Sequence, residues 1–166
     1  LAYFDTAGLF FPYFSAAALH EGGHLLALWG LRGQLQRVTL GFGDVQIRTA
    51  PLPPGAEALC ALAGPAANLL CAGLFLRILP EFAGVSLALG AFNLLPIFPL
   101  DGGRLLRLAL RSTRAARQWE LFVGLLCCAA LLALGLWAAR RLQTGLWVLL
   151  PALIPAARLL RSCDGI

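Results

Sequence analysis

Four long apolar segments constrain the fold of this chain more than any other feature of its sequence. Each is close to the roughly 20 residues that an α-helix needs to cross the hydrocarbon core of a bilayer. A fifth apolar segment, Gly145–Leu160, is shorter and carries two prolines, so we expect a kinked or tilted span there. The four long segments are Leu9–Leu31, Ala58–Leu79, Phe82–Leu100 and Leu121–Ala139.

The composition leaves too few polar residues to cover such segments in water. Hydrophobic residues make up 60% of the 166 residues and charged residues only 13%, whereas a soluble domain has about 25% charged residues. The mean hydropathy is +0.80. We therefore predict an all-α polytopic membrane protein with about five transmembrane helices, in which residues 1–166 form a single domain within the lipid bilayer.

The placement of arginine predicts the orientation of this domain. All 13 basic residues are arginine, and ten of them would lie on one side of the membrane. By the positive-inside rule, that side is the cytoplasm, with the amino terminus outside and the carboxyl terminus inside. No basic tract is interleaved with aromatic residues, so we expect no nucleic-acid partner. The ten are Arg32, Arg37, Arg48, Arg104, Arg107, Arg111, Arg114, Arg117, Arg158 and Arg161.

The connections between the apolar segments also carry patterns. Gln36–Leu40 and Val45–Thr49 are β-branched and roughly alternating on either side of Gly41–Asp44, which predicts a short β-hairpin. The hairpin is either a strand edge for an extended peptide or a simple connector. Over Arg104–Arg111, arginines three and four residues apart are interleaved with leucine and alanine, which indicates an amphipathic helix at the membrane interface.

The first apolar segment contains an HExxH motif, His20-Glu21-Gly22-Gly23-His24. Residues four apart share one face of a helix, so both imidazoles can bind one zinc ion. Glu21 lies about a quarter-turn round the helix, where it can act as a base. We expect Gly22 and Gly23 to leave this face open. The alternative is that the two histidines are hydrogen-bonded within the protein and that a neutral glutamic acid packs between helices. An ionisable residue inside the bilayer costs roughly 3 kcal/mol, which favours a functional role for these residues.

Asp101 is the candidate for the third protein ligand that a catalytic zinc needs. It follows Pro96 and Pro99, which must break the helix. Gly102 and Gly103 come next, and we expect them to allow unusual backbone angles. Irregular backbone at membrane depth is tolerated only beside protein or a water-filled cavity, so the sequence predicts a hydrated pocket. The alternative is that Asp101 caps the following helix.

At these residues the chain resembles the site-2 protease family of intramembrane zinc metalloproteases. Three blocks match in order: HEGGH at His20–His24, AGPAAN at Ala63–Asn68, and NLLPIFPLDGGR at Asn93–Arg104. The third block is most similar to the bacterial stage IV sporulation protease branch, which processes a membrane-associated precursor of a sigma factor. Nothing in the chain resembles the PDZ or CBS domains that some members carry.

The resemblance implies roles for individual residues. His20, His24 and Asp101 would bind Zn²⁺, with Glu21 as the catalytic base. Asn93 would contact the substrate or the oxyanion of the reaction. Asn68 matches a position that is often asparagine in the family, and it is either part of the site or a polar contact between helices.

The resemblance also implies a partner and a location. The substrate would be a membrane protein, cleaved in or near a transmembrane or membrane-associated segment, such as a membrane-tethered transcription or sigma factor precursor. The chain would lie in a bacterial cell membrane. The resemblance also leaves room for a regulatory partner in the membrane. Two alternatives remain: a non-catalytic homologue that binds partners, and a transporter that moves metal or protons.

Overall fold

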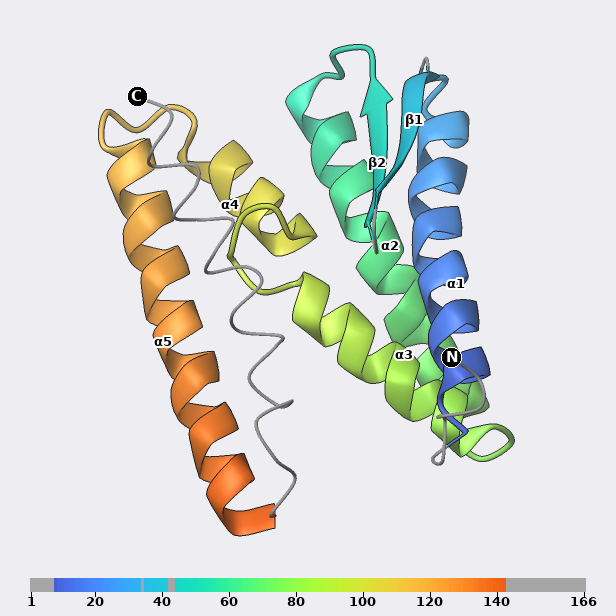
Figure 1. The fold of residues 1–166 in the computed structure, drawn as a ribbon. Coiled ribbons are helices and arrows are strands. Elements are labelled where there is room, and N and C mark those ends of the chain that lie inside the picture. Colours follow the sequence, from blue (N-terminus) through green and yellow to red (C-terminus); the bar gives the residue numbers. More distant parts are fainter. Residues whose placement is uncertain (1–7, 34, 42–43, 143–166) are drawn as a thin grey trace. The chain divides into compact units, whose positions relative to one another are not determined.

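The computed structural model describes residues 8–33, 35–41 and 44–142. The chain divides into two compact units, of which the first ends at Asn93 and the second begins at Leu94. The helices and strands, in chain order, are α1 (Phe10–Gly30), β1 (Leu35–Gly41), β2 (Asp44–Thr49), α2 (Pro54–Phe75), α3 (Pro80–Asn93), α4 (Asp101–Leu110) and α5 (Ala116–Leu142) (Figure 1).

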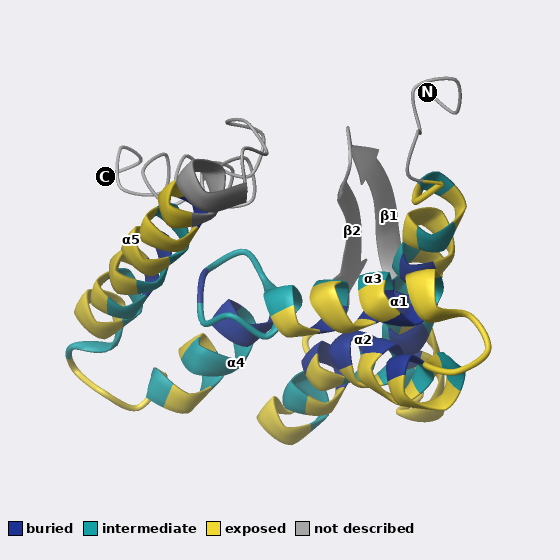
Figure 2. Ribbon diagram, turned by 90° about the horizontal axis from the view of Figure 1, so that it is seen from below, coloured by how far each residue is buried: buried dark blue, intermediate teal, exposed yellow. Residues whose placement is uncertain are grey.

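Three helices, α1, α2 and α3, pack against one another in pairs and form the core of the first unit. The buried residues gather where these helices meet (Figure 2). On α2 the buried residues recur at helical spacing and most are small, which lets neighbouring helices approach closely in a membrane. They are Cys60, Ala61, Gly64, Pro65, Asn68 and Ala72.

Gly23 brings α1 and α2 into backbone contact. A Cβ atom at Gly23 would lie 2.6 Å from the carbonyl oxygen of Ala63, a distance that real Cβ atoms do not show. A Cβ at Gly22 would meet nothing within 4 Å. The expectation that both glycines leave the helix face open is therefore wrong for Gly23, which instead fixes how closely α2 approaches the histidines of α1.

The strands β1 and β2 form a two-stranded antiparallel sheet. Val38 pairs with Ile47 and Leu40 with Val45, and an irregularity in the register lies between Leu35 and Arg37. The two strands correspond to the hairpin predicted over Gln36–Leu40 and Val45–Thr49.

In the second unit, residues 94–100 form turns that lead into α4. A Cβ at Gly102 would overlap the carbonyl oxygen of Leu94, and one at Gly103 would lie 2.6 Å from the carbonyl oxygen of Ile97. The prediction of unusual backbone angles at Gly102 and Gly103 is wrong. Among the described glycines, Gly8 is the one with a positive φ. Gly102 and Gly103 serve instead to let the turns pack directly on the first turn of α4.

The amphipathic helix predicted over Arg104–Arg111 corresponds to α4. Arg107 holds it to α5 through a two-pronged ion pair, in which Nε donates to Glu120 Oε2 over 3.2 Å and the second nitrogen donates to Oε1. The same guanidinium lies 3.9 Å from the ring centroid of Phe98. One arginine therefore connects the turns, α4 and α5.

Two described helices are long and apolar enough to cross a membrane by length and composition: Pro54–Phe75 of α2 and Ala116–Trp137 of α5. Helix α3 has 14 residues, fewer than the roughly 20 of a full span, because the chain turns before Pro96 and Pro99. The predicted span Phe82–Leu100 is thus helical only to Asn93. The fifth predicted segment, Gly145–Leu160, lies outside the described residues.

Large apolar side chains are exposed on the described helices. Trp29 is 80% exposed, and Phe11 and Leu70 are each 74% exposed. In water such a surface would be costly, whereas in lipid it costs nothing, so these side chains fit the predicted membrane environment.

Candidate metal centre

His20 and His24 approach each other from successive turns of α1. Their Nε2 atoms are 3.2 Å apart, and their rings meet edge to face with centroids 4.8 Å apart. Two nitrogen ligands of a tetrahedral zinc ion, each about 2.05 Å from the metal, are separated by about 3.3 Å. The two imidazoles therefore already have the separation that zinc requires of a pair of ligands.

The backbone of α2 orients His24. Its Nδ1 atom lies 2.7 Å from the carbonyl oxygen of Cys60. A carbonyl oxygen only accepts, so Nδ1 donates and carries the proton. The lone pair of the neutral ring is then on Nε2, the atom that faces His20, which is the usual arrangement for a metal-binding histidine held by an outer hydrogen bond.

Gly64 leaves the space into which both imidazoles point. A Cβ at this position would overlap His24 Nε2 and would lie 2.9 Å from His20 Nε2. Gly64 is buried in α2. The two imidazole nitrogens thus lie against α2 at a position where only glycine leaves room for them, and imidazole nitrogen is a ligand that zinc accepts.

Asn68 lies one helical turn beyond Gly64, and its side chain reaches His20. Its Nδ2 atom is 3.4 Å from His20 Nδ1. Asn68 is fully buried, and its Oδ1 atom has no hydrogen-bond partner. The contact joins α2 to α1, so Asn68 is a polar contact between helices, and its partner is one of the predicted zinc ligands.

Asp101 is the first residue of α4 and is only 6% exposed. The helix is preceded by Leu100 as its N-cap, so the alternative that Asp101 is the cap is wrong. Two features of the second unit favour an ionised carboxylate here. The first turn of a helix attracts negative charge, and Arg104 lies 3.5 Å from Asp101 Oδ1.

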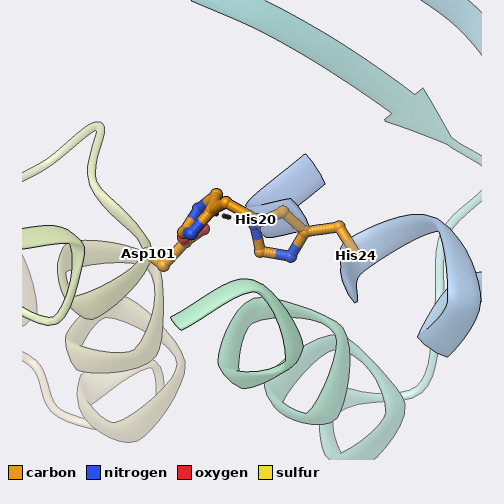
Figure 3. A group of neighbouring side chains, drawn as sticks. All are labelled: His20, His24 and Asp101. Carbon is orange, nitrogen blue, oxygen red and sulfur yellow. Dashed lines mark hydrogen bonds between the residues drawn. The ribbon is translucent and has the colours of Figure 1, made fainter. Parts of the chain in front are cut away.

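Figure 3 draws the three residues that the sequence predicts as metal ligands, His20 and His24 of the first unit and Asp101 of the second. Each offers one atom of a type that zinc binds in catalytic sites, where three protein ligands leave a fourth position open.

The other two predicted site residues lie in the first unit. Glu21 follows His20 on α1 and is half-buried. Asn93 is the last residue of α3, where its Nδ2 atom donates to the carbonyl oxygen of Leu89 over 3.0 Å. That bond uses one of its two amide hydrogens and leaves the second for another acceptor.

The sequence did not single out Gly64 or the Cys60 carbonyl group, although both contact the histidines. Gly64 belongs to the AGPAAN block, but nothing in the block says that its missing Cβ faces the imidazoles. The carbonyl of Cys60 has no side-chain signal at all. Both contacts depend on how α1 packs against α2.

Comparison with known proteins gives three similarities. Residues 75–134 match the model of peptidase family M50. The zinc metalloprotease MJ0392 of Methanocaldococcus jannaschii is 31% identical over 116 aligned residues, which cover 61% of this chain and 34% of that protein. The chain thus spans about a third of the length of that relative.

The third similarity is structural. The structure of the site-2 protease from Methanocaldococcus jannaschii superposes with a TM-score of 0.71, covering 92% of this chain and 76% of the other, at 23% identity. The two chains therefore share a fold over nearly the whole length of this one.

Proposed function

We propose that this chain, a homologue of the site-2 protease type of zinc metalloproteases in peptidase family M50, is an intramembrane zinc endopeptidase. His20, His24 and Asp101 would hold the metal. The observation that carries the proposal is the 3.2 Å separation of the two Nε2 atoms on α1, which matches the spacing of two ligands on one zinc ion.

The proposed reaction is hydrolysis of a peptide bond in or near a transmembrane segment of a membrane protein. Zinc, when bound, supplies a Lewis acid that activates water and polarises the scissile carbonyl. Glu21 takes the proton from the attacking water and returns it to the leaving amine. The second amide hydrogen of Asn93 is available to donate to the oxyanion.

The substrate must be extended where it is cut, because helical carbonyl groups are occupied by hydrogen bonds. Each of β1 and β2 pairs with the other along one edge and has a second edge that the hairpin itself does not use. We propose that an extended substrate segment pairs with such an edge. The block Asn93–Arg104 supports a place for the chain near the stage IV sporulation protease branch, and a bacterial membrane-tethered precursor as substrate.

Removal of Asp101 tests the third ligand. Asp101→Ala should weaken zinc binding by at least about a hundredfold, because loss of a direct ligand costs more than the 10–100-fold that loss of an outer hydrogen-bond partner costs. Zinc content would be measured on the purified protein by elemental analysis, and affinity by competition with a chelator.

Glu120→Gln is the matched control for Asp101→Ala, since Glu120 is another acid of the second unit and pairs with Arg107. It should bind zinc as the wild type does. Zinc binding that is unchanged in Asp101→Ala would move the third ligand elsewhere.

The proposed topology places the loop between α4 and α5 in the cytoplasm and the loop between α2 and α3 outside. The arginines of the first loop support this orientation. Alkaline phosphatase fused after Leu79 should be active, and the same enzyme fused after Arg114 should be inactive. The opposite pattern would invert the topology, and activity in both fusions would argue against α3 as a membrane crossing.

A further inference from the structure

We propose that Asn68 is the positioning residue for His20: its carboxamide oxygen accepts the Nδ1 proton of His20, so that Nε2 is presented to the metal. This inference rests on the proposed function, because it concerns a ligand of the proposed zinc site. It assigns to Asn68 a role for His20 that matches the role of the Cys60 carbonyl group for His24.

The amide of Asn68 contacts the ring of His20. Asn68 Nδ2 and His20 Nδ1 are 3.4 Å apart, and both residues are buried, with 0% and 5% of their surface exposed. No bulk water therefore separates the amide from the ring. Whichever end of the amide faces Nδ1 influences which ring nitrogen of His20 carries the proton.

Metal binding through Nε2 requires one particular tautomer of each histidine. His24 donates from Nδ1 to Cys60, so the lone pair of its neutral ring is on Nε2. A neutral imidazole that binds zinc through Nε2 carries its proton on Nδ1. His20 faces His24 through Nε2, so its Nδ1 must also be protonated when both rings bind one ion, and this proton needs an acceptor.

The carboxamide oxygen of Asn68 is the proposed acceptor for the proton on His20 Nδ1. The Oδ1 atom of Asn68 is buried and has no hydrogen-bond partner, so no other bond holds it in its present place. A half-turn of the amide about its last torsion angle exchanges Oδ1 with Nδ2. Oδ1 then stands at the place from which it can accept the His20 proton.

Helix α3 holds the side chain of Asn68 beside His20. A Cβ at Gly90 of α3 would lie 3.1 Å from Asn68 Cβ and 3.2 Å from the carbonyl oxygen of Pro65. Helix α3 thus packs directly against this part of α2, and its glycine gives the room for Asn68. A half-turn of the amide about its last torsion angle therefore leaves the Asn68 side chain beside His20.

Two substitutions separate this role from simple packing. Asn68→Leu keeps the approximate size of the side chain and removes both polar atoms, and Asn68→Asp keeps two acceptor oxygens and removes the donor. We expect the leucine variant to bind zinc 10–100-fold more weakly, the usual cost of losing an outer partner of a metal-bound histidine. The aspartate variant should bind zinc at least as tightly as the wild type.

The measurement is the zinc dissociation constant of the purified full chain, by chelator competition, together with the visible spectrum of the cobalt-loaded protein. Ser86→Ala is the matched control, because Ser86 Oγ is also buried without a partner. It should change neither the zinc dissociation constant nor the cobalt spectrum. If the leucine variant does not fold, Asn68→Ala replaces it in the comparison.

Two results would overturn the role of Asn68: wild-type zinc affinity in the leucine variant, or an equal loss of affinity in the aspartate and leucine variants. The second would mean that the amide acts as a donor or only by its shape. The proposed function fails separately, if the wild-type protein binds no zinc or if His20→Ala binds as much zinc as the wild type.

Discussion

Replacement of Glu21 by glutamine is expected to lower the rate of peptide cleavage by about 10²–10⁴-fold, the usual contribution of a general acid–base group. The amide has nearly the same size as the carboxyl group, but it cannot accept the proton of the attacking water or return it to the leaving amine. Zinc content should stay that of the wild type, because the proposed ligands are His20, His24 and Asp101. The combination of bound metal and lost turnover is what identifies a base.

The measurement uses the purified protein in lipid vesicles with single-span membrane polypeptides, and maps cleavage products by mass spectrometry. Glu81→Gln is the control, since Glu81 is an exposed acid in the first turn of α3, and it should cleave at the wild-type rate. Undiminished cleavage by Glu21→Gln would remove Glu21 from the mechanism. Loss of zinc in that variant would make it a metal ligand instead.

The features that could be predicted from the sequence are those that depend on local patterns. The HExxH spacing predicts that two imidazoles share one face of a helix, and α1 presents His20 and His24 in this way. The spacing of the arginines among leucines predicts a helix over Arg104–Arg111, and α4 covers all but the last of these residues. Such patterns can be read locally because each follows from the 3.6-residue period of a helix.

The features that could not be predicted depend on close approach between segments distant in the sequence. Gly23 meets the backbone of Ala63, and Gly102 meets Leu94. In the sequence, a glycine that gives backbone freedom looks the same as one that gives room. Gly102 was expected to give backbone freedom and Gly23 an open helix face, whereas in both cases a neighbouring backbone occupies the space of the missing side chain.

Gly64 is the glycine whose replacement should weaken zinc binding most, because it leaves room for both imidazoles. In Gly64→Ala the new methyl group would overlap His24 Nε2 and lie 2.9 Å from His20 Nε2 and 2.6 Å from His24 Cε1. Both rings would have to shift to make room for the methyl group, and the separation of their Nε2 atoms would change. We expect zinc binding to weaken by at least about a hundredfold, beyond the 10–100-fold cost of disturbing an outer partner, and cleavage to be lost with it.

Gly73→Ala on the same helix is the matched control, because a Cβ there would meet nothing within 4 Å. Alanine is favoured over glycine in a helix by about 1 kcal/mol, so neither variant should lose α2 itself, and circular dichroism would verify that both keep their helix content. A folded Gly64→Ala protein that binds zinc as tightly as Gly73→Ala would mean that the two imidazoles do not bind an ion beside this glycine. Loss of zinc in Gly64→Ala alone would mean that one missing methyl group on α2 is as necessary to the metal centre as the histidines on α1.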